Sequence, residues 1–174
     1  MKESLDLIFP TIADKEKVLA YRQEFFDQGE PIIPGGAFLD SIKTYEEWLD
    51  QVEKSAHANT VPENLVPSDT FLVIRQSDQK MVGIIQLRYA LNEGLKDFGH
   101  CGYSVRPSER QKGYATNMLS QIVKKAQEAK MDYLQLSASQ SNLPSIKTIL
   151  KNGGQYQWSF PHGQEEGKVY FIFL

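Results

Sequence analysis

A basic turn at residues 110–115, Arg-Gln-Lys-Gly-Tyr-Ala, follows a short apolar run and precedes an amphipathic segment. Apolar side chains in that segment recur at helical spacing, at Ala115, Met118, Leu119, Ile122, Val123 and Ala126. The turn therefore lies where a helix begins, and there the first backbone N–H groups lack partners and the helix dipole favours an anion. Gly113 lets a phosphate approach the backbone, while Arg106, Arg110 and Lys112 add positive charge. We interpret the turn as a seat for an anion, and that anion as a pyrophosphate.

Composition and charge argue against several other classes of protein. At 174 residues the chain can bury one substantial core, and we expect a single domain over residues 1–174. A net charge of −3, without a basic stripe interleaved with aromatic residues, argues against a nucleic-acid partner. Cys101 is the only cysteine, which rules out an internal disulfide and a cysteine-cluster metal site; no metal is predicted.

The chain shows no sign of a targeting or membrane segment. Its first residues lack the apolar run of a signal peptide, and no segment is long enough to cross a bilayer. We therefore expect a cytoplasmic protein with no membrane partner.

Apolar runs and turn residues along the chain predict an α/β fold. Strands are expected at residues 5–9, 70–75, 81–91, 98–105, 132–137, 156–160 and 168–174. Helices are expected at about residues 14–28, 44–55, 114–126 and 141–152, because each of these segments shows helical spacing or capping signals. The predicted order is β-α-α-β-β-β-α-β-α-β-β, in a mixed sheet of about seven strands flanked by about four helices. The crossover helix makes strands 98–105 and 132–137 parallel.

Two long irregular segments occupy the front half of the chain, at residues 30–42 and 57–69. Loops of this length in a compact domain are often functional. Together with Arg88 and Asn92, at the end of a predicted strand, they are expected to form the walls of a site. Acidic residues in them (Glu30, Asp40 and Glu63) would suit a cationic ligand, although solvated loop acids are commoner.

Several motifs in order resemble those of the GNAT N-acetyltransferases. Residues 110–115 match Arg/Gln-x-x-Gly-x-Gly/Ala, the acyl-CoA pyrophosphate signature of that family, and match neither the P-loop nor the dinucleotide-binding pattern. Residues 81–85 and 102–107 resemble its third and fourth strands, and the segment from Asn142 to Gly154 resembles its last helix. Residues 85–92 and 99–110 are similar to a bacterial subgroup known only as predicted acetyltransferases. The resemblance covers nearly the whole chain and implies a single GNAT-like domain.

The resemblance implies that acetyl-CoA is the co-substrate. In the family, the pantetheine arm lies between the splayed fourth and fifth strands. That implies contacts with Ser104 and Val105 here, and with Asn142 and Ser145 on the last helix. The pyrophosphate would bind the amides around the basic turn. The residues implied there are Arg110, Gln111, Lys112, Gly113, Tyr114, Ala115 and Thr116. Asn142 has a second role open to it, as the cap of its helix.

The catalytic groups are harder to assign. His100 is the titratable group closest to the family's base position, and it is our candidate catalytic residue, with Glu93, Asp97 or a loop acid as alternatives. Cys101 and His100 are neighbours on a strand and point to opposite faces, so they form no dyad. The family's tyrosine acid falls at Ile149. Either Tyr103 or Tyr156 replaces it, or the thiolate leaves unassisted.

These features predict an acetyl-CoA-dependent N-acetyltransferase that acts on a primary amine by direct attack in a ternary complex. The expected partners are acetyl-CoA and an amine-bearing small molecule or peptide. A homodimer is also considered, through the edge of the closing hairpin. Two other interpretations stay open: an acyl-CoA-binding sensor without catalysis, and a domain that binds another phosphorylated ligand.

Overall fold

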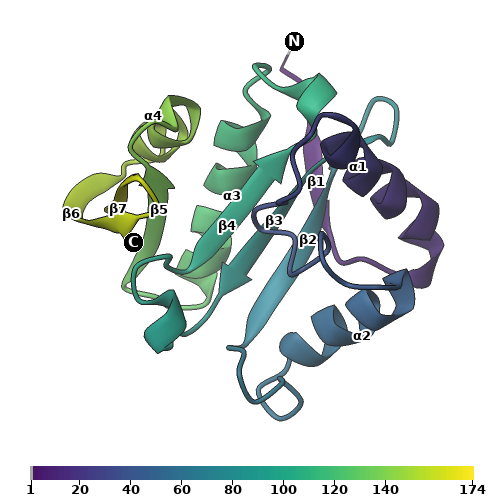
Figure 1. The fold of residues 1–174 in the computed structure, drawn as a ribbon, viewed down its shortest axis with the longest axis horizontal. Coiled ribbons are helices and arrows are strands. Elements are labelled where there is room, and N and C mark those ends of the chain that lie inside the picture. Colours follow the sequence, from purple (N-terminus) through teal and green to yellow (C-terminus); the bar gives the residue numbers. More distant parts are fainter. Residues whose placement is uncertain (1) are drawn as a thin grey trace.

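The protein is described by a computed structural model that covers residues 2–174. Seven strands and four α-helices follow one another along these residues (Figure 1). The strands are β1 (Leu5–Ile8), β2 (Ser68–Arg75), β3 (Met81–Arg88), β4 (Cys101–Val105), β5 (Tyr133–Ser139), β6 (Gln155–His162) and β7 (Glu165–Phe173). The helices are α1 (Lys15–Asp27), α2 (Tyr45–Ser55), α3 (Tyr114–Glu128) and α4 (Leu143–Lys151). The order predicted from the sequence is confirmed.

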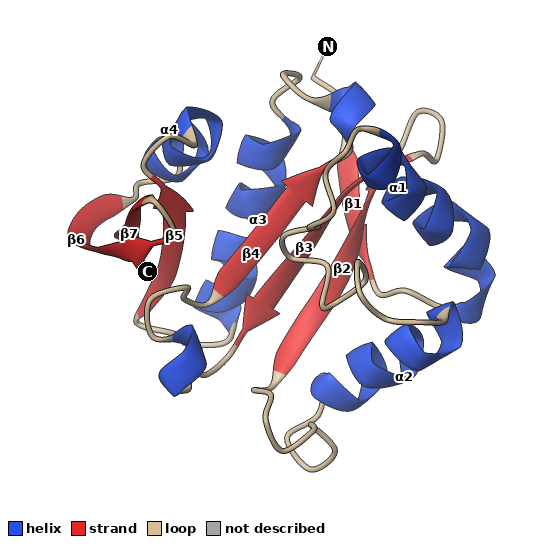
Figure 2. Cartoon of the chain, in the orientation of Figure 1, coloured by secondary structure: helices blue, strands red, loops and turns tan. Residues whose placement is uncertain are grey.

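Strands β1 to β4 form an antiparallel sheet in sequence order, covered by helices on both faces (Figure 2). Alternation along each strand divides its side chains between two cores. Helices α1 and α2 bury Tyr21, Phe25 and Trp48 against one face. Helix α3 buries Met118 and Ile122 against the other. Both faces are thus apolar, which explains the nearly continuous apolar runs of β2 and β3.

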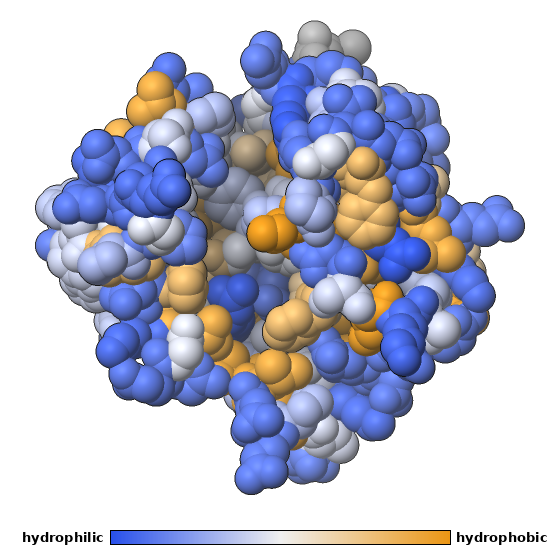
Figure 3. All heavy atoms as spheres, in the orientation of Figure 1, coloured by the Kyte–Doolittle hydropathy of each residue, from blue (hydrophilic) through white to orange (hydrophobic). Residues whose placement is uncertain are grey.

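Strands β5, β7 and β6 form a second sheet, which carries α4 beside it. This sheet is joined to the first by one isolated bridge, between Gly99 and Leu136. The bridge is antiparallel. The arrows of β4 and β5 point the same way in Figure 1, but the strands separate beyond the bridge and, within residues 2–174, are not hydrogen-bonded as the parallel neighbours that the sequence predicts. The seven predicted strands therefore belong to two sheets that meet at one end of β4 and β5. Figure 3 shows the face hollowed between the β5–β7 part and the β1–β4 part.

Predicted boundaries differ from the structure at several strand ends. Strand β2 begins at Ser68, two residues earlier than expected, and β3 ends at Arg88, three residues earlier. Strand β4 begins at Cys101 because Gly99, at φ 86°, breaks the extended chain just before it. No helix in residues 2–174 is long and apolar enough to cross a membrane.

Candidate functional site

The opening between β4 and β5 begins where two hydrogen bonds hold the strands together. The His100 backbone N–H donates to the Gln135 carbonyl at 2.7 Å. The Gln135 backbone N–H donates to Nδ1 of the His100 side chain at 2.9 Å. Beyond this point β4 pairs only with β3, so one side of its backbone faces the opening.

The register of β4 shows which residues turn their backbone toward the opening. His100 accepts from the Arg88 N–H, and the Arg106 N–H donates to Val82, so the even-numbered residues face β3. Backbone groups alternate along an antiparallel strand, and the N–H and C=O groups of Tyr103 and Val105 therefore face the opening. Val105, predicted to contact the pantetheine arm, thus has its backbone on this side. The backbone of Ser104 faces β3 instead, and its Oγ and carbonyl lie 2.9 and 3.0 Å from the Tyr21 hydroxyl, so the cofactor contact of Ser104 stays a prediction.

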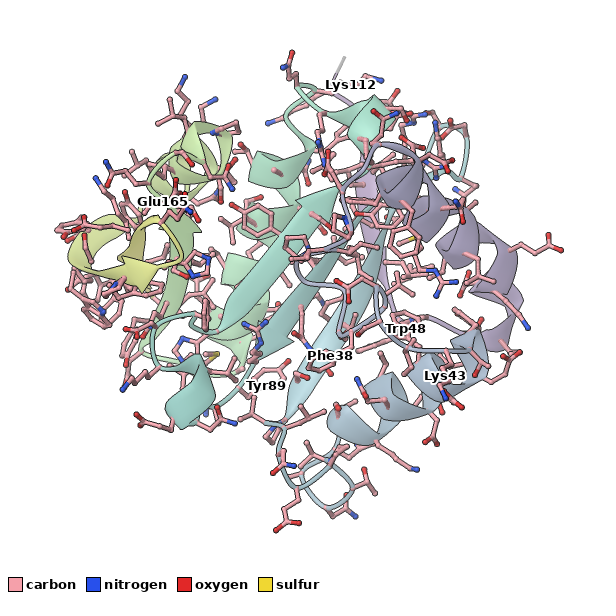
Figure 4. All side chains as sticks on the ribbon, in the orientation of Figure 1. Phe38, Lys43, Trp48, Tyr89, Lys112 and Glu165 are labelled. Carbon is pink, nitrogen blue, oxygen red and sulfur yellow. The ribbon has the colours of Figure 1, made fainter. Side chains whose placement is uncertain are left out.

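The start of α3 lies at the wide end of the opening, where Figure 4 labels Lys112. Within residues 2–174, no protein group accepts a hydrogen bond from the backbone N–H of any residue from Gln111 to Thr116. Gly113 caps the helix at φ 80°, a conformation that favours glycine, and a Cβ added there would meet no atom within 4 Å. The turn thus offers unpaired donors, a helix dipole and free space, which together can bind a diphosphate.

The cations of the basic turn are already paired with carboxylates. Arg110 forms a bidentate pair with Glu30, at 2.8 and 2.6 Å, and Arg106 pairs with Glu24. Lys112 binds Glu109 at 2.7 Å. The sequence suggested that these cations would bind the anion directly. The structure instead leaves the backbone amides as the unpaired donors among residues 2–174, because Glu24 and Glu30, far away in the sequence, and the nearby Glu109 reach the cations.

Glu109 is the centre of a charge cluster beneath the turn. Its side chain is 5 % exposed and accepts from Arg75, Lys80 and Lys112. Although burial raises the pKa of Glu109, the hydrogen bonds from these three cations lower it to about 2. Asp78 also pairs with Arg75, so three cations face two carboxylates and the cluster keeps one positive charge. The turn is therefore held rigidly on a base of net positive charge.

Helix α4 forms the other wall of the opening. The Asn142 side chain accepts from the Ser145 N–H at 3.3 Å and caps the helix. Ser145 lies one turn into α4, and its Oγ is 2.8 Å from the Tyr103 hydroxyl. Tyr103 thus reaches from β4 to α4 across the opening. Asn142 and Ser145 lie at the start of α4, where Tyr103, suggested by the sequence as a possible acid, also reaches; their contact with the cofactor stays a prediction.

His100 joins the two sheets, and this contact limits what else it can do. Because Nδ1 accepts from Gln135, the proton of the neutral ring is on Nε2. Burial, and then the charge of Arg88, lower the pKa of His100. Its one lone pair is therefore already engaged, and the geometry favours a positioning role for His100 over proton removal. The sequence could not indicate this, because Gln135 is 35 residues away.

The other candidate catalytic residues differ in their surroundings: some are buried, some are exposed and some are already paired with another side chain. Ile149 is fully buried in the α3-side core, so the family's acid position faces away from solvent. Tyr156 is exposed on β6 and contacts Ser159. Glu93 pairs with Lys96, and Asp97 accepts from Trp158. Burial raises the pKa of the Cys101 thiol to about 12, as expected for an inert core cysteine.

A cavity of about 560 Å³ lies between α2 and the ends of β2 and β3. Its walls come from α2, from the two predicted loops and from the ends of β2 and β3. Figure 4 labels Phe38 in this region, on the same face as Trp48 of α2. Asp40, Arg88 and Asn92 line it, as the sequence suggested, whereas Glu30 is paired with Arg110 beside the start of α3.

Side chains of α2 hold the loop that forms the cavity wall. Trp48 Nε1 donates to the Gly36 carbonyl at 2.8 Å, and Gln51 Nε2 donates to the Ala37 carbonyl at 3.1 Å. Ala37 and Phe38 both have positive φ, 51° and 67°, which is uncommon for residues other than glycine. These bonds stabilise the unusual backbone. Phe38, 56 % exposed, is thereby presented to the cavity.

A known domain family and several solved structures resemble this chain. Residues 7–155 match the model of the acetyltransferase (GNAT) domain. A search of curated proteins found no match. Among solved structures, the GNAT-family acetyltransferase from Bacillus anthracis is 21% identical, with a TM-score of 0.66 over 99% of this chain and 96% of that one.

Two further structures share the fold at lower identity. The ribosomal-protein-S5-alanine acetyltransferase from Vibrio fischeri is 16% identical, with a TM-score of 0.72 over 99% of this chain and 93% of that one. The ribosomal L7/L12 alpha-N-protein acetyltransferase RimL, in complex with coenzyme A, is 11% identical, with a TM-score of 0.73 over 98% and 94%. Because the domain match covers most of its length, this chain belongs to the GNAT family of acetyltransferases.

Proposed function

We propose that this protein transfers the acetyl group of acetyl-CoA to a primary amine by direct attack in a ternary complex. One observation carries the proposal: β4 and β5 separate beside a helix start whose amides, from Gln111 to Thr116, lack partners in the described part of the chain. An extended thiol arm fits the opening, and a diphosphate fits the amides. The structural relative RimL was solved with coenzyme A.

Each part of the opening has a role in this reaction. Acetyl-CoA supplies the activated thioester. The N–H groups of Tyr103 and Val105 face the opening and can donate to the oxyanion that develops on the thioester carbonyl. As the amine nitrogen bonds to that carbon, the carbon–sulfur bond breaks and the sulfur leaves as a thiolate.

Tyr103 is the group placed to assist the departing thiolate. Its hydroxyl lies at the wall of the opening, 2.8 Å from Ser145 Oγ. Burial raises the pKa of Tyr103, so the phenol stays protonated and acts by donating a hydrogen bond. A thiol of ordinary pKa, about 8.5, needs no complete proton transfer to leave. Because the lone pair of His100 is engaged, we assign removal of the ammonium proton to water at the mouth of the opening.

A coupled-thiol assay with a panel of amines tests the proposal. We expect release of CoA that depends on both acetyl-CoA and an amine, with one acetylated amine formed for each thiol. Acetyl-CoA binding without CoA release on any amine would favour the sensor interpretation. That interpretation stays open because Ile149 is buried at the family's acid position and Nδ1 of His100 already accepts from Gln135. Stronger thermal stabilisation by a nucleotide than by CoA would favour a different phosphorylated ligand.

A further inference from the structure

Arg88 places a guanidinium where the two sheets meet. It is the last residue of β3, and its Nη1 donates to the Gly99 carbonyl at 3.0 Å. A Cβ added to Gly102 would lie 3.4 Å from Nη2, so the guanidinium lies over β4 where that strand has no side chain. Gly99 and His100 are the residues at which β4 contacts β5. Arg88 therefore lies beside the narrow end of the opening.

The charge of Arg88 has no counter-ion among residues 2–174. Arg75, Arg106 and Arg110 each form an ion pair with a carboxylate. Arg88 forms none, and within these residues its guanidinium makes one hydrogen bond, to a backbone carbonyl. Arg22 is likewise without an ion pair and donates to the Leu39 carbonyl. Burial lowers the pKa of Arg88, which shows that its surroundings disfavour an unpaired charge. An anion bound there would offset that cost.

Arg88 lines the cavity of about 560 Å³. Its other lining residues include Ser68, Gln86, Asn64 and Asn92, which are neutral and polar. Asp40 is the only acidic lining residue, and its Oδ2 accepts from the Ile33 N–H at 2.8 Å. The cavity thus presents one guanidinium fork among polar and apolar side chains, with one acid whose Oδ2 is already engaged, a geometry suited to a single carboxylate.

The geometry points to an amine acceptor that carries a carboxylate, bound by Arg88, so that the acceptor is an amino acid or a close derivative of one. This inference rests on the proposed function, because it places the acceptor amine at the same opening as the acetyl group. Arg88 lies against β4 beside that opening. A carboxylate bound there would be only a short spacer away from the reacting nitrogen.

Matched acceptors test the inference without changing the protein. Each amino acid is compared with its own carboxamide and with the amine that lacks the carboxyl group. We expect kcat/KM to be about 10- to 100-fold higher for the carboxylate, because loss of a charge-assisted bidentate contact has an effect of that order. Equal rates for carboxylate and carboxamide would overturn the inference. Preference for an aminoalkyl phosphonate over the carboxylate would also overturn it.

Variants then locate the effect. Arg88→Gln should raise KM for the carboxylate about 10- to 100-fold and leave the carboxamide unchanged, and Arg88→Lys should fall between. Lys43→Gln is the charge control, since Lys43 is exposed and does not line the cavity. Equal losses for both acceptors in Arg88→Gln would contradict the assignment. If that variant does not fold, the wild-type comparison of carboxylate with carboxamide still decides.

The same assays separate this inference from the proposed function. CoA release from none of these amines would count against the proposed function. CoA release at the same rate with and without a carboxylate on the acceptor would refute only this inference.

Discussion

The two ends of the hollowed face are built in different ways. At the end proposed to bind acetyl-CoA (the donor end), consecutive backbone amides from Gln111 to Thr116 present hydrogen-bond donors from one turn. At the end proposed to bind the amine (the acceptor end), side chains and loops from α2, β2, β3 and two long segments meet around one cavity. The donor end depends on local backbone conformation, whereas the acceptor end depends on long-range packing. Changes at one end should therefore leave the other largely unaffected.

The largest effect is expected from charge at Gly113. Its positive φ disfavours most side chains, but asparagine and aspartate tolerate it and have nearly the same shape. Gly113→Asp should weaken CoA binding about 100-fold, because the carboxylate would lie where the diphosphate binds, while Gly113→Asn should lose about 10-fold or less. Calorimetric titration with CoA measures both. Equal affinities for the two folded variants would contradict a diphosphate at this turn.

Tyr103→Phe should affect chemistry at the opening more than binding. It removes the hydroxyl beside Ser145 and keeps the ring that packs against the α3-side core. We expect kcat to fall about 10-fold with CoA affinity nearly unchanged, as for loss of one hydrogen bond to a developing charge. Tyr156→Phe, on the exposed face of β6, is the matched control and should retain full activity. An unchanged kcat in Tyr103→Phe would show that the thiolate leaves without this hydroxyl.

Trp48→Phe tests the acceptor end alone. It removes the indole bond to Gly36 and leaves an aromatic ring in the core. Loosening this wall should raise KM for the acceptor about 5-fold, since one hydrogen bond contributes about 1 kcal/mol, and CoA affinity should stay the same. Glu53→Gln, on the exposed face of α2, is the control. A comparable loss of CoA affinity in Trp48→Phe would mean that the two ends are coupled.

His100→Asn should have the smallest effect on activity. The asparagine Oδ1 can accept from Gln135 as Nδ1 does, so we expect kcat within about 3-fold of wild type. Because the pKa of His100 is lowered in the fold, the unfolded chain binds the proton more readily. The free energy of unfolding should therefore fall as pH decreases below about 6.5, and the variant should lack that part of the decrease. A loss of kcat above about 100-fold would restore His100 as the catalytic base.

The same contrast explains what could be predicted from the sequence. Helix α3 and its turn were found because apolar spacing and Gly113 are local signals. The order of strands and helices was found for the same reason. The pairing of Arg110 with Glu30, the engagement of Ser104 by Tyr21 and the bond of Gln135 to His100 span 35 or more residues. Such contacts depend on how the elements pack, which no local pattern records.

The cavity shows an intermediate case. Its walls were anticipated from two long loops with Arg88 and Asn92, since loops of that length in a compact domain are often functional. The sequence does not predict that the unpaired charged side chain lining the cavity is a cation. Glu30, an acid expected to face a cationic ligand, is bound to Arg110 at the other end, and Arg88 is left unpaired. Counting charged residues in the loops could not reveal which of them the fold neutralises.

Amide hydrogen exchange at Tyr114, Ala115 and Thr116, with and without CoA, tests the central claim most directly. These N–H groups have no acceptor among residues 2–174, so they should exchange rapidly in the free chain. If they bind the diphosphate, CoA should slow their exchange strongly, with a smaller effect at the cavity residues around Phe38. Unchanged exchange at all three amides under saturating CoA would contradict the account.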